Sequence, residues 1–496
     1  MLLTADIETR LRKFDGATSV EVRENGVRIA TIESEAFSWR LRGSPDKPVL
    51  AVHSEQINIT HRIVGISAAN DNRLALSFER LGKARPGRIE FLRLDFARPA
   101  REVARDEFRL TLARVLAERF PDETLEAPLV TGPDLEHSMS GNYVRGVMRS
   151  PSGRWALLAV PDSETAATST NALTFGLLWL ARVRETAREG YIIGLKLIVA
   201  KDAGKKIAHL AKALSSSIAL EIFEYEPRSQ SLLRIDPHSF VNRENWLVAN
   251  RARQVLLDSA AGEIDPIVAI APKAIELHPD PHNSEIILRF RGLAFARWEN
   301  HQVFFGEGGD LRKRLTAATY GDLQKLLRDF ENYRHPLATN TRHPLYRAQP
   351  ERWLETIVRS DVTRIDADLD RRFVYTQLFA NSAGERSILD ILTVTKSGRL
   401  AIIELKASEH IHLPLQAAEY WLRIRQHLEQ GDFANCGYFP QQELQNAPPL
   451  VYLVAPALRF HPTTGLLQRH LSQSMEVMRV GLAESWRRGL RIVMRQ

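Results

Sequence analysis

The 496-residue chain contains a single cysteine, Cys436, so it can form neither an internal disulfide framework nor a cysteine-rich zinc site. No apolar run reaches the roughly eighteen residues that a membrane-spanning helix needs. The first ten residues carry acids and lack the apolar core of a signal peptide. These absences argue against a disulfide-rich secreted scaffold and against a membrane partner. We expect a cytoplasmic protein.

The composition is that of an ordinary globular protein, with 44% hydrophobic and 26% charged residues. The length exceeds what one hydrophobic core usually organises, so we expect two to four domains. A net charge of +7 suits a polyanionic partner such as nucleic acid, although arginine is spread along the whole chain. Composition alone therefore leaves nucleic-acid binding open.

The order of predicted elements divides the chain into four parts. Residues 1–98 contain short alternating segments separated by turn formers, which predict a β-rich accessory domain, most simply a small β-sandwich. Residues 99–228 open with a helical pattern and continue as strand-turn-strand, helix, strand, helix, strand. Residues 229–345 predict a linker with β-rich and helical parts. Residues 346–496 repeat the element order of the second part.

The repeat predicts an α/β domain present twice. The turn glycines Gly153 and Gly398 are 245 residues apart, and matching arginines of the following helices are 241 apart. In this register the ionisable residues of the second copy have no counterpart in the first, so we interpret the first copy as degenerate. The predicted equivalences are Arg145 with Asp390, Ala159 with Glu404, Pro161 with Lys406 and Phe175 with Gln416.

The linker carries two features that could suggest function. His278 and His282 lie in a segment with two prolines, which we predict to be a loop and a poor cage for zinc. From Arg312 to Arg347 basic residues alternate with tyrosines, a pattern that suits either a phosphate backbone or a solvated face beside a linker.

The most informative stretch runs from Ser387 to Ala407 and predicts two apolar strands joined by Lys396-Ser-Gly398. A three-residue hairpin loop closed by a left-handed glycine pairs Thr395 with Arg399 and so sets Asp390 opposite Glu404. Directly opposed side chains lie about 5 Å apart on one face of the sheet. Two carboxylates at that distance repel unless a cation lies between them, and oxygen ligands favour Mg²⁺ or Mn²⁺.

Period-two alternation places Lys406 on the face of Glu404. With these residues the chain resembles the PD-(D/E)XK nuclease superfamily, through Leu389-Asp390 and Glu404-Leu405-Lys406. Gln416-Ala-Ala-Glu-Tyr420 is similar to the Gln…Tyr motif of its RecB-type members, and an upstream helix supplies Glu355. The resemblance covers residues 347–496. It departs from the family name only in having Leu389 in place of proline.

The resemblance implies a restriction-endonuclease-like fold, a mixed sheet flanked by helices, and a magnesium-dependent nuclease or endonuclease that acts on DNA. Asp390, Glu404 and the backbone carbonyl of Leu405 would bind Mg²⁺ or Mn²⁺, with Glu355 as an additional ligand and Glu351 as its alternative. Lys406 would orient or deprotonate the attacking water. One helical turn apart, Gln416 and Tyr420 would orient water or contact the phosphate.

Alternatives remain at this stage. Glu404 and Lys406 could form a surface ion pair, although their apolar neighbours argue against exposure. His410 and His412 lie between the motifs and could border the site. A non-catalytic DNA-binding or scaffold protein with a nuclease-like fold would show the same motif.

The expected partners follow from the same resemblance. One active copy per chain favours a homodimer for cutting both strands of a duplex. The segment Gly306–Asp310 lacks the ending of a phosphate-binding P-loop, so a helicase or another ATP-driven DNA-processing partner would be a separate chain.

Overall fold

The computed structural model describes the chain except for residues 1–2, 15–18, 26, 34–36, 45, 55–56, 71, 80–85, 95–98, 135, 163, 165, 188–189, 238–246, 307–312 and 383–384. Most of the Gly306–Asp310 segment, and Arg312, therefore lie outside the described residues. In the described part, no helix is long and apolar enough to cross a membrane.

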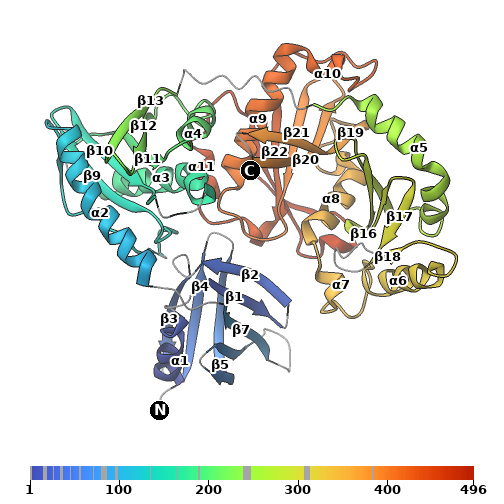
Figure 1. The fold of residues 1–496 in the computed structure, drawn as a ribbon, viewed down its shortest axis with the longest axis horizontal. Coiled ribbons are helices and arrows are strands. Elements are labelled where there is room, and N and C mark those ends of the chain that lie inside the picture. The colour runs from blue at the N-terminus through green and yellow to red at the C-terminus, as the bar shows by residue number, and fades with distance from the viewer. Residues whose placement is uncertain are drawn as a thin grey trace. The chain divides into compact units, whose positions relative to one another are not determined.

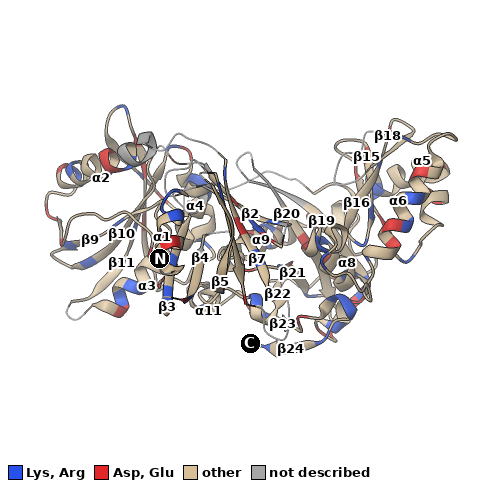
Figure 2. Ribbon diagram, turned by 90° about the horizontal axis from the view of Figure 1, so that it is seen from below, with Lys and Arg blue, Asp and Glu red and all other residues tan. Residues whose placement is uncertain are grey.

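The chain forms two compact units, whose elements are labelled in Figure 1. The first contains Met1–Asn242 and two later segments, Glu409–Leu415 and His461–Gln473. The second contains the remainder, Arg243–Ser408, Gln416–Phe460 and Ser474–Gln496. Lys and Arg are distributed over many helices and strands, as Figure 2 shows, and Asp and Glu are interspersed among them.

The N-terminal part of the first unit is β-rich, as predicted. Its strands are β1 (Ser19–Glu24), β2 (Val27–Glu33), β3 (Ser38–Ser44), β4 (Lys47–His53), β5 (Asn58–Asn70), β6 (Arg73–Phe78) and β7 (Gly87–Arg93). They form one antiparallel sheet in the order β2-β1-β7-β6-β5-β4-β3, rather than the two packed sheets of a sandwich. A helix that the sequence prediction lacks, α1 (Leu3–Leu11), packs Ile7 and Leu11 into the core of this sheet.

The second sheet follows the helix α2 (Pro99–Arg119), which the sequence predicts. Its strands are β8 (Thr124–Leu125), β9 (Val144–Ser150), β10 (Gly153–Ala159), β11 (Ile192–Ala200), β12 (Ala219–Glu226) and β13 (Ser231–Ile235). The helices α3 (Ala166–Thr186) and α4 (Gly204–Ala211) connect β10 to β11 and β11 to β12. Since both connections are helical crossovers, these strand pairs are parallel, and the hairpin pairs are antiparallel.

The second unit begins with the helix α5 (Asn250–Val268) and a five-stranded antiparallel meander. Its strands are β14 (Ile275–Asp280), β15 (Glu285–Phe290), β16 (Leu293–Glu299), β17 (Gln302–Phe305) and β18 (Lys313–Arg314). The predicted loop around His278 is thus mostly a strand. Because β14 is an edge strand, Pro279 costs no hydrogen bond in the middle of the sheet. The helices α6 (Tyr320–Tyr333) and α7 (Pro344–Arg347) follow.

The second set of α/β elements lies in the second unit, apart from its segments Glu409–Leu415 and His461–Gln473, which belong to the first. Its strands are β19 (Leu369–Ser382), β20 (Glu385–Thr395), β21 (Leu400–Leu405), β22 (Leu450–Pro456), β23 (Val477–Leu482) and β24 (Ile492–Arg495). Its helices are α8 (Pro350–Ser360), α9 (Leu413–Gln430), α10 (Asp432–Asn435) and α11 (Thr464–Gln468). Short 3₁₀ turns lie at Val362–Arg364, Ala457–Arg459 and Trp486–Arg488.

The two six-stranded sheets have the same topology. One runs β8-β9-β10-β11-β12-β13 and the other β19-β20-β21-β22-β23-β24. In each, the two central crossover pairs are parallel and the remaining pairs are antiparallel. This agreement is what the predicted duplication requires, and the mixed α/β class is confirmed.

The register within the first hairpin corrects one predicted equivalence. Ala159 pairs with Val144, while Arg145 pairs with Leu158. The residue opposite Ala159 is therefore Val144, not Arg145. The difference arises because the first hairpin has a two-residue loop between Ser150 and Gly153, whereas the second has a three-residue loop. Arg145 is buried, donates to the carbonyl of Gly132 and lies over the Trp179 ring.

Two segments of the repeated C-terminal part belong to the first unit. Leu214 and Leu471 form an isolated antiparallel bridge, flanked by hydrogen bonds from Ser215 N to the His470 carbonyl (2.9 Å) and from Ser472 N to the Ala213 carbonyl (2.8 Å). Residues 213–215 follow α4, and residues 470–472 follow α11. These two helices occupy the same place in their copies, between the last two parallel strands. The bonds are reciprocal, as between two copies of one motif.

Candidate active site

The hairpin of β20 and β21 has the register that the sequence predicts. Val394 pairs with Leu400 and Ile391 with Ile403, and Thr395 N donates to the Arg399 carbonyl at 2.8 Å. Continued by one pair, this register sets Asp390 opposite Glu404.

Gly398 closes the loop of this hairpin with φ of 93°. A Cβ atom there would lie 2.1 Å from the Glu443 carbonyl oxygen, so only glycine fits.

Charged groups of the hairpin are buried together. Glu404 is 1% exposed and Lys406 is 7% exposed, and the Lys406 Nζ donates to Glu404 Oε1 at 3.0 Å. Asp390 Oδ2 accepts a hydrogen bond from the Leu405 backbone N–H at 3.0 Å. A surface ion pair is therefore excluded for Glu404 and Lys406, which was the main structural alternative from the sequence.

The electrostatics show that this cluster is short of positive charge. Burial raises the pKa of Glu404, and the nearby charge of Asp390 raises it further. Burial likewise raises the pKa of Asp390, against the opposing effect of Lys406. Burial disfavours the charged form of Lys406, but the charges of Glu404, Glu351 and Asp390 outweigh it and raise the Lys406 pKa. The Lys406 ammonium thus interacts with the carboxylates of Glu404, Glu351 and Asp390.

Glu404 also has an oxygen that the protein leaves unused. Its Oε2 is buried and has no hydrogen-bond partner among the described residues. A buried carboxylate oxygen without a donor is costly, and a bound cation removes that cost. Carboxylate oxygens are the donors that Mg²⁺ and Mn²⁺ prefer, so the residues present fit such an ion.

The structure limits which protein groups could bind the ion. No group of three or more His, Cys, Asp or Glu side chains in the described part of the chain is arranged to hold a metal. A protein ligand set of Asp390, Glu404 and the Leu405 carbonyl, completed by water, is compatible with that finding. Mg²⁺ commonly keeps several waters in such sites.

The helix α8 brings two acids to the hairpin. It begins with Pro350 at its first position, and Leu354 and Val358 pack in the core. Glu351 Oε1 is 3.4 Å from the Ala407 backbone N–H. Glu355 is 3% exposed, and burial raises its pKa. Both acids that the sequence offered as an additional ligand therefore face the site.

Arg352 is the site residue that sequence reasoning missed. Its Nη1 lies 2.7 Å from Glu355 Oε2 and 3.5 Å from Asp390 Oδ1. The guanidinium thus bridges the helix acid and the strand acid. The i, i+3 spacing to Glu355 was a visible signal, but such pairs are common on exposed helix faces.

Gln416 and Tyr420 meet on the helix α9, as their spacing predicts. Gln416 Nε2 donates to the Tyr420 hydroxyl at 3.3 Å, and that hydroxyl donates to the Ile388 carbonyl at 2.9 Å. Burial raises the pKa of Tyr420, and the negative charge of Glu404 raises it further. Tyr420 therefore stays a neutral hydroxyl beside the acids.

The contacts of the candidate histidines are as follows. His412 Nδ1 is 2.9 Å from Thr174 Oγ1, and its ring packs edge-on against Phe175 in the first unit. His410 belongs to the same segment, Glu409–Leu415. On β14, His278 Nε2 lies 3.4 Å from Glu276 Oε2. The backbone N–H of His282, in the following turn, donates to Asp280.

Comparison with known protein families finds no family that matches the chain. No curated protein matches it either. Among solved structures, the crystal structure of a repair endonuclease from Pyrococcus abyssi is similar over 45% of this chain and 94% of its own. The sequence identity is 12% and the TM-score is 0.15, a similarity that establishes neither a shared fold nor a shared activity.

Proposed function

We propose that this chain is a metal-dependent nuclease that hydrolyses phosphodiester bonds of DNA. The observation that carries the proposal is the buried cluster on one face of the hairpin: Asp390, Glu404 and Lys406, with a Glu404 oxygen that no described residue satisfies. A buried carboxylate oxygen without a hydrogen-bond donor destabilises the folded state. A cation that also engages substrate phosphate accounts for it.

In this proposal Asp390, Glu404 and the Leu405 carbonyl hold Mg²⁺ or Mn²⁺. When bound, the ion would neutralise negative charge that develops on the phosphate. Lys406, whose pKa is raised, keeps its proton and donates hydrogen bonds to the phosphate or to the attacking water.

Gln416 and Tyr420 would position the attacking water. The Tyr420 hydroxyl donates its hydrogen bond to the Ile388 carbonyl and accepts one from the Gln416 side-chain N–H, which fixes the orientation of the amide. Glu355 would act through Arg352, holding the guanidinium beside Asp390. Homodimerisation and a separate helicase partner remain predictions from the sequence.

One observation favours a second candidate, a DNA-binding or scaffold protein without catalysis. Arg352 already bridges Glu355 and Asp390, and Lys406 already contacts Glu404, so protein cations offset part of the charge. If these contacts suffice, a metal would be unnecessary for folding and DNA could bind without being cut.

Cleavage with matched lysine variants separates the two candidates. Wild type, Lys406→Ala and Lys396→Ala are incubated with plasmid, single-stranded and branched DNA in Mg²⁺, Mn²⁺ or EDTA. Lys396 is exposed in the turn of the same hairpin and serves as the control. We expect cleavage by wild type and Lys396→Ala with metal only, and a loss of about 10²–10³-fold in Lys406→Ala, as for other transition-state donors.

The contrary outcome is equally clear. In that outcome, wild type and Lys406→Ala bind DNA equally and leave every substrate intact in both metals. That result would establish the scaffold candidate and reject the nuclease.

A further inference from the structure

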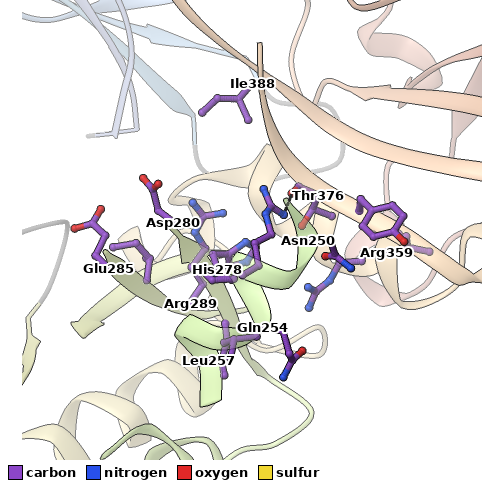
Figure 3. Close-up of a pocket in the computed structure, with 16 residues that line it drawn as sticks. Asn250, Gln254, Leu257, His278, Asp280, Glu285, Arg289, Arg359, Thr376 and Ile388 are labelled. Atoms are coloured by element: carbon purple, nitrogen blue, oxygen red, sulfur yellow. Dashed lines mark hydrogen bonds between the residues drawn. The ribbon is translucent and has the colours of Figure 1, made fainter. Parts of the chain in front are cut away.

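A cavity of about 320 Å³ lies in the second unit, beside the candidate active site. It is enclosed by α5, the hairpin of β14 and β15, the last turn of α8 and the strands β19 and β20. Figure 3 shows its lining residues. Its volume is at the lower end of the range for small-molecule sites and suits one nucleotide-sized group.

Strand alternation turns a polar face toward this cavity. On β15, Ile286, Leu288 and Phe290 are fully buried in the core of the meander, while Glu285, Ile287 and Arg289 line the cavity. Cross-strand pairing sets Glu276 beside Arg289 and Asp280 beside Glu285. One face of the β14–β15 hairpin therefore presents charged side chains to the cavity, and the other face packs in the hydrophobic core.

Three arginines contribute to the lining. Arg253 Nη1 donates to the Thr376 carbonyl at 3.4 Å, and Arg359 Nη2 lies 3.5 Å from Glu276 Oε2. Among the described residues, Arg289 forms no ion pair, and its buried Nε has no hydrogen-bond partner. Burial, with the charge of Arg352 acting in the same direction, lowers the pKa of Arg289 to about 10. A desolvated guanidinium in this state favours an anion.

Two elements, β20 and α8, contribute residues both to the cavity and to the candidate active site. Ile388 lines it and lies two residues from Asp390, so both side chains face the same side of β20. On α8, Arg359 lines it, and the helical repeat sets Arg352, Glu355 and Arg359 along one face of the helix. A strand whose phosphate is near Asp390 could therefore extend into the cavity.

Acids at the far end of the cavity restrict what can enter. Asp280 and Glu285 pair across the end of the β14–β15 hairpin, away from Arg359 in Figure 3. Burial raises the pKa of Glu285, and Asp280 adds to that effect. Carboxylates there repel a further phosphate but accept hydrogen bonds from nucleoside hydroxyl or amino groups. A DNA strand that ends in the cavity would place its phosphate near the arginines and its nucleoside near Asp280 and Glu285.

We propose that this cavity binds the terminal nucleotide of a DNA strand, with a terminal phosphate monoester on Arg289 and Arg359. This inference rests on the proposed nuclease function and names its substrate class, DNA with a phosphorylated end. The monoester carries more negative charge than an internal diester, which suits the unpaired guanidinium. The same chemistry would admit a free nucleoside monophosphate.

Binding in EDTA tests the proposal without cleavage. Fluorescence anisotropy compares short single strands that carry a 5′-phosphate, a 3′-phosphate or hydroxyl ends only, and dAMP is added as a competitor. We expect one phosphorylated end to bind at least about tenfold tighter than the hydroxyl form, the equivalent of one good charge-assisted contact. We expect dAMP to compete for it.

Matched variants assign the effect to the cavity. Arg289→Gln and Arg359→Gln should each remove most of the preference for the phosphorylated end. Arg328→Gln, on the exposed face of α6, should leave it unchanged. Thermal melting checks that each variant is folded.

Each remaining outcome decides a claim. Equal binding of phosphorylated and hydroxyl ends, or an unchanged preference in both folded cavity variants, overturns the proposal. Competition by dAMP without any preference among strand ends makes the cavity a free-nucleotide site and also overturns it. A preference for phosphorylated ends in a protein that cuts no DNA with Mg²⁺ or Mn²⁺ rejects the nuclease function and keeps the cavity assignment.

Discussion

At the residue scale, the second unit contains several buried charged side chains, among them Glu355, Glu404 and Lys406. Asp390, Glu404 and Lys406 could be predicted because ionisable residues at period-two spacing interrupt apolar strands. Their roles stay predictions, but the structure shows Glu404 and Lys406 buried and Asp390 partly buried beside them. Arg352 and Arg289 could not be predicted, because their significance depends on neighbours from other elements that no local pattern reveals.

His278 supplies a pH prediction at this scale. Burial lowers the pKa of His278 to about 4, and Glu276 offsets only part of the effect. The neutral ring is therefore the form that the fold favours. Its stabilising contribution is complete above the unfolded pKa of 6.5 and is lost as pH falls from 6.5 toward 4. The facing charged groups are Glu276, Arg289 and Arg359.

At 1.36 kcal/mol for each pH unit between 6.5 and 4, His278 changes the free energy of unfolding by at most about 3–4 kcal/mol. Wild type should lose melting temperature between pH 7 and pH 4.5 more steeply than His278→Gln. Parallel melting curves of the two proteins over this range would show that His278 does not contribute.

At the element scale, Arg334 joins the meander to α6 and α7. It is fully buried, and burial lowers its pKa to about 9. Its guanidinium donates to the carbonyls of Phe290 (3.1 Å), Arg291 (2.8 Å), Leu345 (2.8 Å) and Ala348 (2.7 Å), and it lies 4.7 Å from the Trp353 ring centre. The basic and aromatic stretch that suggested a phosphate track thus includes a structural cation.

Replacing Arg334 should therefore destabilise the second unit. Lysine cannot reproduce the planar fork, so Arg334→Lys should cost about 3 kcal/mol or more, as for other disrupted buried charge networks. Urea unfolding followed by tryptophan fluorescence measures the change, since Trp353 lies against the guanidinium. Arg328→Lys, an exposed position on the same helix, is the control. Equal midpoints for the two variants would contradict the structural role.

Elements with clear periodicity could be predicted from the sequence, and others could not. The β20–β21 hairpin and α8 combine regular apolar spacing with turn or helix-start residues. The long strand β19 carries Arg371 and Arg372 and an irregular register near Leu369, which an edge strand tolerates but which obscures alternation. The short helix α1 is not predicted from the sequence. The strand β14 contains Glu276, His278, Pro279 and Asp280, so its local composition predicts a loop instead.

At the scale of the whole molecule, two six-stranded sheets share one strand order, and the positions of Asp390 and Glu404 face each other in the second of them. The repeat could be predicted because element order survives in the hydrophobic pattern. The inclusion of Glu409–Leu415 and His461–Gln473 in the first unit could not, because it depends on tertiary contacts between segments far apart in the chain. In the first sheet, Val144 and Ala159 occupy the paired positions that correspond to Asp390 and Glu404, so this strand order forms without the two acids.

The central claim, hydrolysis at the Asp390–Glu404–Lys406 cluster, is tested most directly by cleavage in ¹⁸O-labelled water. Wild type and Glu404→Gln are purified side by side and incubated with end-labelled DNA and Mn²⁺, and the new ends are analysed by mass spectrometry. With wild type, the account predicts one ¹⁸O in the single terminal phosphate that each cleavage creates and an unlabelled hydroxyl on the other new end. It predicts no new ends with Glu404→Gln or with EDTA. New ends formed equally by both proteins, or by neither, would contradict it.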